Sequence, residues 1–495
     1  MRNKLIKSFL LFLLFFKTDA QQSLESIYEQ SAQLRHDRSD DVLQKMRDSD
    51  FEVTYRPILL REMIETGLRQ NFDQTIREYQ SSLLEISMDN AHDSFWYPRL
   101  KIDLSSGPHP IIDLSRWETQ PSDPGGYLGI GFDNYTVFNW GKDYLTYLNS
   151  KTTYKRGKDS IIEDRRAFRH QMIIAFFNLW QIHEIEKIWQ ENLRQAAFIY
   201  KLNRQKVELK KVRIEEYHQA RSEYLRAQQS YQQARINVEI ADEEISNLLN
   251  NDIGTRYTLK ETLAYLTLDD QFSELLQYAL EKNSSILDAA TELEISSRAY
   301  KIALKDNMPL PKFSLNLGGY SHVAGTGINS TKYSTGGTLG NNSLDLVAAV
   351  NATWTLWGVN GFLNRRLQQT AKVQKDIAEK RLQQSKVQTS SLTRQYYRKV
   401  LNYQDQIKIL AASIENDSKL VDEALDSYMN GKAIFLDFKH ALDNHTSSQI
   451  NFVQNKFLHL KNKIMLAEEM GMDDMPGKNF EELALLEIEK EKDNL

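Results

Sequence analysis

Apolar residues recur every three to four positions along several long stretches of the chain. The repeat runs through 168–200, where Glu186 is the one residue that breaks it, and through 217–248 and 450–467. Alanine is frequent at one position of the repeat, which lets neighbouring backbones approach closely. A sustained repeat of this kind predicts helices packed side by side as coiled coils. A soluble coiled-coil rod would show the same pattern, so the repeat alone does not decide the class of protein.

The positions of proline and glycine indicate how long these helices can be. Proline is absent from 125–308 and from 312–475, and glycine is absent from 158–253. Between 362 and 470 the only glycine is Gly431. Stretches without either residue can hold helices far longer than the average of about 11–12 residues.

In each half of the chain, one very long helix and two shorter ones are expected. In the second half the long helix runs from about 361 to 428, which is roughly 68 residues or ~100 Å. The helix that returns, 433–470, covers only about half of that distance. The segment at 272–306 could supply the rest by stacking on its end. The corresponding helices of the first half are expected at 149–207, 214–249 and 58–95.

Two regions, 97–140 and 311–357, break the helical pattern and alternate apolar with polar residues. The clearest alternation, at 344–356, has one apolar face and one face of mostly small or polar residues. Such a face over about a dozen residues is typical of a tilted transmembrane β-strand. Trp140, Trp354 and Trp357, near the ends of these regions, are expected at the membrane interface. A Gly-, Ser-, Thr- and Asn-rich loop is expected at 318–343. The alternative is an edge hairpin of a soluble sheet.

The two halves of the chain are copies of each other. Tyr97-Pro98 and Leu310-Pro311 open the two strand regions, and Trp140-Gly141 and Trp357-Gly358 close them. The offset between matching positions drifts from about 212 to about 221 residues, as small loop insertions would produce. The sequence therefore predicts a tandem duplication in which each half reads helix, strand pair, long helix, turn, helix.

The duplication and the chain ends give a domain plan. Residues 1–20 have the basic start, short apolar core and small terminal residue of a secretory signal peptide. The first mature residue would be Gln21 rather than cysteine, which excludes a lipid anchor there. The expected segments are a signal peptide at 1–20, an N-terminal periplasmic segment at 21–57, a first repeat at 58–265, a second repeat at 266–471 and an acidic C-terminal tail at 472–495.

Composition narrows the chemistry. The chain has 495 residues, a net charge of −5 and no cysteine, so disulfides and thiolate metal sites are excluded and no nucleic-acid partner is indicated. His440 and His445 are five positions apart, which does not place them on one helical face for a metal. No glycine-rich phosphate loop or nucleophile motif is present. We therefore expect no cofactor and no enzymatic activity.

One group of residues resembles a known family. Tyr428-Met429-Asn430-Gly431, followed by Leu436-Asp437 and Ala441, is similar to the periplasmic turn of the TolC-like outer-membrane efflux proteins. The proline that opens each strand pair and the Trp-Gly that closes it also match. The resemblance covers nearly the whole mature chain, from about residue 55 to about 472.

The resemblance implies a mainly α protein with a small β part. Three copies would form a homotrimer in which long coiled-coil hairpins build an α-barrel and each subunit gives four transmembrane β-strands. The implied function is a passive outer-membrane exit duct, with a large periplasmic portion, of a tripartite efflux or type I secretion system. Its partners would be outer-membrane lipid, a periplasmic adaptor and an inner-membrane pump of the RND, ABC or MFS class. The alternative from another class is a soluble periplasmic coiled-coil scaffold.

The resemblance also suggests roles for residues near the turns. Asp437 falls where members carry an acidic residue at the pore constriction, and Glu216 occupies the matching place in the first copy. One turn later, where members often have a second acid, this chain has His440, which could make the constriction sensitive to pH.

Docking of the adaptor is expected around both turns. The expected contacts are Tyr428 and Gly431 in the second copy and Lys210 and Arg213 in the first. Lys210 is a departure from the family pattern, because it stands where the second copy has Gly431. A lysine is unfavourable where the backbone adopts left-handed geometry, so either the two turns differ or the alignment of the two copies is shifted there.

Overall fold

The computed structural model describes residues 54–107, 111–113, 118–120, 125–208, 212–252, 254–324, 344–358 and 361–486. The predicted signal peptide, nearly all of the predicted segment at 21–57 and most of the predicted loop at 318–343 lie outside these residues. The chain divides into two units, of which the smaller comprises Met1–Pro57 and Asn251–Thr258. In the smaller unit, strand β1 (Thr54–Ile58) pairs with β6 (Thr255–Leu259). All that follows concerns the larger unit.

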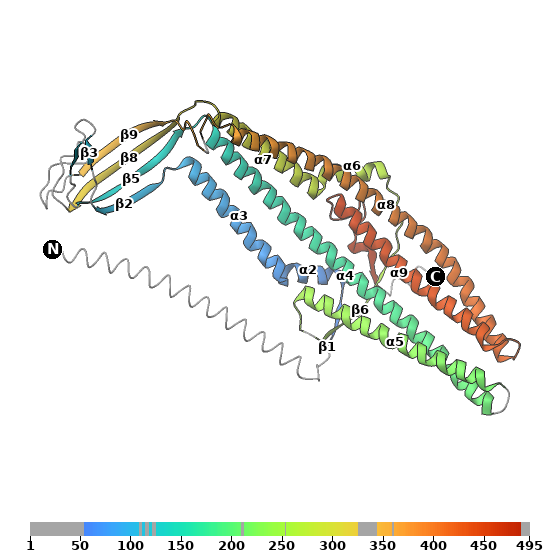
Figure 1. Ribbon diagram of the computed structural model, residues 1–495. Coiled ribbons are helices and arrows are strands. Elements are labelled where there is room, and N and C mark those ends of the chain that lie inside the picture. Colours follow the sequence, from blue (N-terminus) through green and yellow to red (C-terminus); the bar gives the residue numbers. More distant parts are fainter. Residues whose placement is uncertain are drawn as a thin grey trace. The chain divides into compact units, whose positions relative to one another are not determined.

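Two antiparallel helical hairpins form most of the larger unit (Figure 1). In the first hairpin, α4 (Lys142–Glu208) packs against α5 (Ile214–Leu249), and in the second, α8 (Arg366–Met429) packs against α9 (Phe435–Glu469). The helix expected at 214–249 begins and ends at those residues. Absence of proline thus permits α4 to run for 67 residues and α8 for 64.

The helices expected at 58–95 and 272–306 are each two helices rather than one. The first is α2 (Leu60–Gln70) and α3 (Phe72–Trp96), and the second is α6 (Phe272–Lys282) and α7 (Ser284–Asp306). The breaks fall at Asn71 and Asn283, whose backbones are extended, with ψ of 135° and 130°. Each asparagine caps the following helix, because its side-chain oxygen accepts a backbone N–H of that helix's first turn.

The same two asparagines join stacked helices end to end. The side-chain amide of Asn71 donates to Leu248 O, 3.0 Å away at the end of α5. The side-chain amide of Asn283 donates to Glu469 O, 2.9 Å away at the end of α9. We call each such junction a splice. Carbonyls at a helix C-terminus have no partner within the helix, and the splice supplies one, so α3 continues the line of α5 and α7 that of α9.

A four-stranded antiparallel sheet has the order β2-β5-β8-β9. Its register pairs Leu100 with Phe132 and Leu315 with Val350, so these apolar side chains share one face. Strand β9 ends at Thr353, so Trp354 lies just beyond it rather than inside the expected strand at 344–356. The strands are β2 (Leu100–Gly107), β5 (Gly125–Phe138), β8 (Lys312–Ala324) and β9 (Leu344–Thr353), with a separate pair β3 (Ile111–Asp113) and β4 (Glu118–Gln120).

The helices pack side by side. Next to the sheet, α3 contacts α4, α4 contacts α7, and α7 contacts α8. Toward the hairpin turns, α4 contacts both α5 and α9, and α9 contacts α8. The buried apolar side chains of α4 include Phe176, Phe177 and Leu179. None of the helices in the described part of the chain is long and apolar enough to cross a membrane.

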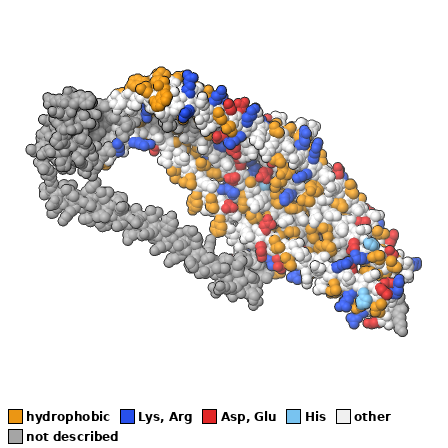
Figure 2. All heavy atoms as spheres, viewed as in Figure 1, with side chains coloured by type: hydrophobic (Ala, Val, Ile, Leu, Met, Phe, Trp, Pro, Cys, Tyr) orange, Lys and Arg blue, Asp and Glu red, His pale blue; other side chains and the backbone are white. Residues whose placement is uncertain are grey.

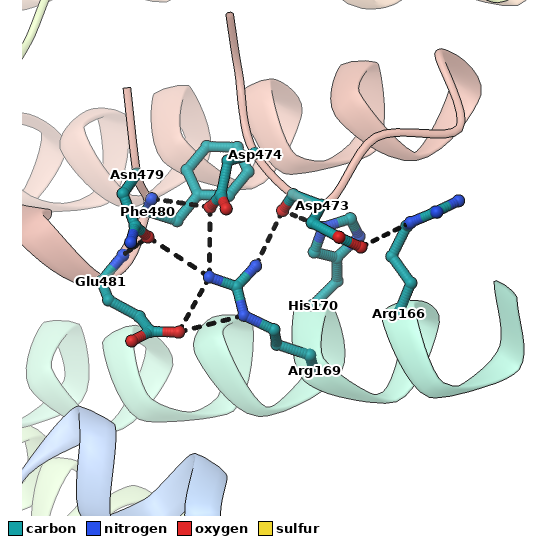
Figure 3. Close-up of polar contacts among 8 residues, drawn as sticks. All are labelled: Arg166, Arg169, His170, Asp473, Asp474, Asn479, Phe480 and Glu481. Atoms are coloured by element: carbon teal, nitrogen blue, oxygen red, sulfur yellow. Dashed lines mark hydrogen bonds and ion pairs between the residues drawn. The ribbon is translucent and has the colours of Figure 1, made fainter. Parts of the chain in front are cut away.

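The segment at 472–486, which we call the C-terminal strap, folds back onto α4 (Figure 3). The Arg169 guanidinium lies 3.1 Å from a carboxylate oxygen of Asp474 and 2.8 Å from one of Glu481. Beside it, His170 Nε2 donates to Asp473 O at 2.8 Å, and burial lowers the pKa of this histidine so that it stays neutral. The strap ends with η1 (Glu481–Leu483) and β10 (Ala484–Leu486), which pairs with β7 (Glu261–Leu263).

Candidate functional site

The turn between α8 and α9 is built around Gly431. Its φ is +71°, a conformation that L side chains rarely adopt, and an added Cβ would meet nothing within 4 Å. The glycine is therefore required by the backbone geometry and not by crowding. Gly431 N donates to Tyr428 O at 3.2 Å, which closes the turn. At the start of α9, Ile434 N donates to a carboxylate oxygen of Asp437 at 3.3 Å, so Asp437 caps that helix.

Tyr428 lies at the centre of an apolar cluster between the two hairpins. Its side chain is only 2% exposed and packs beside Phe435 and Phe438, with Ile199 and Ala220 from the first hairpin in the same cluster. Burial raises the pKa of the Tyr428 phenol. The hydroxyl therefore keeps its proton and can act as a donor.

That hydroxyl crosses to the first hairpin. It donates to the side-chain oxygen of Asn203, a fully buried residue of α4. Lys206, one turn further along α4, donates to Tyr428 O at 3.3 Å and holds its ammonium 4.6 Å from the centre of the Tyr428 ring. Tyr428 thus receives a hydrogen bond and a cation–π contact from the same lysine.

Two further polar contacts join the hairpins. The Lys439 ammonium of α9 lies 3.3 Å from a carboxylate oxygen of Glu223 on α5. Burial alone would lower the pKa of Lys439, but Asp443 and Glu223 together raise it, so the lysine stays charged. Further from the turns, Asn192 Nδ2 donates to Thr446 Oγ1 at 3.0 Å. We call the bonds of Asn203, Lys206, Glu223 and Asn192 to the second hairpin the cross-hairpin ladder.

The residues expected at the pore constriction lie on the first turns of α5 and α9, next to the hairpin turns. Asp437 and His440 are exposed on the first turns of α9, and Glu216 is half-buried on the first turn of α5. Burial is the main cause of the raised pKa of the Tyr428 phenol, and the charge of Glu216 also raises it. In the described part of the chain no hydrogen bond or ion pair joins Asp437 to Glu216.

The residues expected to dock a partner have different surroundings. Gly431 and Arg213 are exposed at their turns. The ring of Tyr428 is buried, so its side chain offers no surface to a partner in this structure. Lys210 lies outside the described residues.

Asn203 and Lys206 are functional candidates that the sequence interpretation missed. A signal for Asn203 was present, because the apolar repeat of α4 includes Ala196 and Tyr200, and the next position of the repeat is residue 203. An asparagine on an apolar seam commonly marks a specific polar contact. Lys206 carries no comparable signal, since lysines are usual at helix ends.

The three tryptophans expected at the membrane interface all lie where the sheet meets the helices. Trp140 has a φ of +56° and its Nε1 donates to Pro311 O at 2.9 Å. Trp354 and Trp357 follow β9, and Trp357 is 77% exposed. Among the described residues, no group of three or more histidine and acidic side chains could hold a metal ion.

Comparison with known proteins agrees with this architecture. The family model of the outer membrane efflux protein matches residues 275–471. The CmeC outer membrane channel of Campylobacter jejuni is similar in structure, with a TM-score of 0.66 over 88% of this chain and 89% of that chain at 18% identity. The outer membrane protein VceC of Vibrio cholerae gives 0.67 over 83% and 96% at 14% identity. The open state of the MtrE outer membrane channel of Neisseria gonorrhoeae gives 0.63 over 84% and 89% at 14% identity.

These likenesses establish a TolC-like outer-membrane channel fold and confirm the fold class expected from the sequence. A comparison with curated protein sequences finds no match.

Proposed function

We propose that the chain, whose residues 275–471 match the outer membrane efflux protein family, is the exit duct of a tripartite efflux or type I secretion system. The observation that carries the proposal is that one chain joins two parts. One part is a sheet with one apolar face, and the other consists of helical hairpins whose long helices, α4 and α8, have more than 60 residues each. The apolar face of the sheet can contact membrane lipid, and the long hairpins can pack side by side into a conduit across the periplasm. The soluble scaffold is not supported, because the solved structures that match are outer-membrane channels.

The duct is a homotrimer. At one edge of the helical layer, α3 exposes an apolar stripe to which no other described element packs, and α8 exposes another at the opposite edge. Strands β2 and β9 are likewise the two edges of the sheet. When two different edges of identical copies cover each other, the copies close into a ring if the rotation between them permits it. The stripes are Ile76, Tyr79, Leu83 and Ile86 on α3, and Val373, Ile377 and Val387 on α8.

The hairpin turns are the place where a periplasmic adaptor docks, with an inner-membrane pump of the RND, ABC or MFS class supplying the energy. Gly431 and Arg213 are the exposed residues that support this assignment. Asp437, Glu216 and His440 form the constriction of the pore, where three copies would present rings of carboxylates that favour cations. Trp140, Trp354 and Trp357 lie at the membrane interface. The duct has no catalytic step of its own.

Opening of the duct breaks the cross-hairpin ladder. The ladder holds the second hairpin against the first through a few polar bonds, each with a net contribution of about 0.5–1.5 kcal/mol. The Tyr428→Phe variant keeps the buried ring but removes the hydroxyl that bonds Asn203. The variant therefore weakens the contact between the hairpins without loss of the apolar cluster.

The test has two stages. Fractionation should retain the wild-type protein in outer membranes, and mild detergent should extract it at three times the mass of the chain. Single-channel recording in planar bilayers should then show that Tyr428→Phe raises the open probability, while Tyr403→Phe, a half-buried tyrosine of the same helix, does not. Recovery from the soluble periplasm would overturn the duct. A trimer whose gating is the same in both variants would leave the duct standing and overturn the role of the ladder.

A further inference from the structure

An exposed apolar patch with two arginines lies where β9 leads into α8. Its members are Trp354, Leu356, Trp357, Leu363, Arg365 and Arg366, and we call them the β9–α8 patch. Leu356 and Leu363 are each 58% exposed, and all six side chains are open to solvent. Figure 2 shows hydrophobic side chains gathered in this region beside Lys and Arg. Exposed apolar side chains gathered in one place indicate a surface that another molecule covers.

The backbone fixes this arrangement. Leu363 N donates to Leu356 O at 3.2 Å, and Phe362 N donates to Thr355 O at 3.0 Å, so the two leucines are held side by side. Asn364 Nδ2 donates to Gly358 O at 2.8 Å, which ties the start of α8 to the turn. These hydrogen bonds hold Leu356, Leu363 and the start of α8 in place.

The charge of the patch is positive. In the described part of the chain, neither Arg365 nor Arg366 forms an ion pair. The first turn of α8 contains no acidic residue. The N-terminus of a helix carries a partial positive charge, which adds to that of the two guanidinium groups. Guanidinium groups bind phosphate through paired hydrogen bonds. Apolar side chains beside two arginines and a helix N-terminus together fit an anionic amphiphile.

The first repeat provides an internal comparison. At the turn from β5 into α4, the Lys142 ammonium lies 2.7 Å from a carboxylate oxygen of Asp306, and Lys305 donates to Trp140 O at 2.6 Å. The indole of Trp140 is bonded to Pro311 O. The cations and the tryptophan at that turn are therefore engaged within the chain, whereas among the described residues neither Arg365 nor Arg366 has an ion pair.

We propose that the β9–α8 patch binds an anionic phospholipid of the leaflet that faces the periplasm, with the phosphate at Arg365 and Arg366 and the acyl chains on Trp354, Leu356, Trp357 and Leu363. This rests on the proposed function, which places the apolar face of the sheet in the outer membrane. The patch continues that face, since Val350 of β9 is also exposed. A lipid is therefore the occupant that meets both the apolar and the basic part of the patch.

The probes are phosphatidylglycerol and phosphatidylcholine, which share acyl chains and differ in headgroup charge. Full-length trimer is reconstituted in nanodiscs of the two lipids in equal amounts, and the lipid retained after gentle detergent transfer is measured by native mass spectrometry. The wild type should retain phosphatidylglycerol preferentially. Arg365→Gln/Arg366→Gln should lower this preference by about fivefold for each arginine removed. The matched control is Lys380→Gln/Arg381→Gln, another exposed basic pair on α8.

Each other outcome overturns the lipid site. Equal retention of the two lipids by the wild type, or an equal preference in the two double variants, would exclude recognition of the headgroup by the arginines. The chain has no cysteine, so Trp357→Cys supplies a single reactive thiol. If that thiol cross-links two copies within the trimer, the occupant is a neighbouring subunit instead. In all these cases, recovery of a trimer from outer membranes would still support the proposed function as a duct.

Discussion

The splice at Asn283 should be one of the most sensitive points in the helical wall. Its side-chain oxygen caps α7 at Ile286 N and also accepts a hydrogen bond from Thr389 of α8 at 3.2 Å. Its amide donates to Glu469 O at the end of α9. One side chain therefore joins three helices, and Asn283→Ala removes all of these bonds without adding bulk.

The size of the effect follows from what each lost bond leaves behind. Loss of an N-cap costs about 1 kcal/mol. Thr389 is 3% exposed and Asn283 is 6% exposed, so the atoms that lose a partner are shielded from water. A buried donor or acceptor left unsatisfied costs about 1–3 kcal/mol. The splice should therefore weaken by about 2–4 kcal/mol, which raises the population of locally opened molecules between about 30-fold and about 1,000-fold.

Limited trypsin digestion is the assay, because Lys282 directly precedes the splice and its peptide bond to residue 283 must open to be cut. Cleavage at this bond is followed by mass spectrometry in the detergent-solubilised trimer. Asn283→Ser, which keeps a capping oxygen, should lie between the wild type and Asn283→Ala. The matched control is Ser285→Ala, an exposed neighbour on the same turn. If Asn283→Ala is cut no faster than Ser285→Ala, the splice does not hold the junction and the reasoning is refuted.

Three further perturbations have definite expected results. Gly471→Ala should prevent assembly of native trimer, as scored by gel filtration, because φ is +65° and the new Cβ would lie 2.4 Å from Lys282 O; a normal trimer yield would contradict this. Arg169→Ala should destabilise the C-terminal strap by about 3–5 kcal/mol, since Glu481 and Asp474 would remain partly buried without their cation. Backbone amides of the strap should then exchange hydrogen faster in this variant than in the control Arg194→Ala. Burial lowers the pKa of His459 to about 3, so at pH 5 this histidine is protonated in the unfolded chain but not in the folded one. The free energy of unfolding should therefore fall by about 2 kcal/mol between pH 7 and pH 5. If the denaturant midpoint of His459→Gln falls by the same amount over this pH range, His459 is not the cause.

The sequence was sufficient to predict the end of α8 because a glycine marks it. Gly431 is the only glycine between 362 and 470, and α8 ends two residues before it. The strand regions were also predictable, since period-two alternation is incompatible with a helix that must bury one face. The alternation of apolar and polar residues could not predict where β9 ends, because Trp354 and Leu356 continue the apolar pattern after strand pairing has stopped.

The splices show why other features could not be predicted. Asn71 and Asn283 gave no clear signal, because an asparagine inside a helical pattern is not a strong breaker. The break depends on the carbonyls of Leu248 and Glu469, which are about 180 residues away in sequence. Long-range partners of this kind are absent from any local pattern. In the same way, nothing in the turn motif indicates that the ring of Tyr428 is buried, because its cover comes from Ile199 of the other hairpin.

The splices and the cross-hairpin ladder together suggest why the duct would open at its turns. A splice makes two stacked helices behave as one rod, and around Phe176 the wall is packed with large apolar side chains that resist rearrangement. At the turns the hairpins are joined by the apolar cluster around Tyr428 and by polar bonds of Asn203, Lys206 and Glu223, and the net contributions of these bonds add up to a few kcal/mol. Docking of a partner protein can supply free energy of that size. We therefore expect movement at the turns, where these polar bonds lie, and we expect the spliced helices to transmit it as rigid rods.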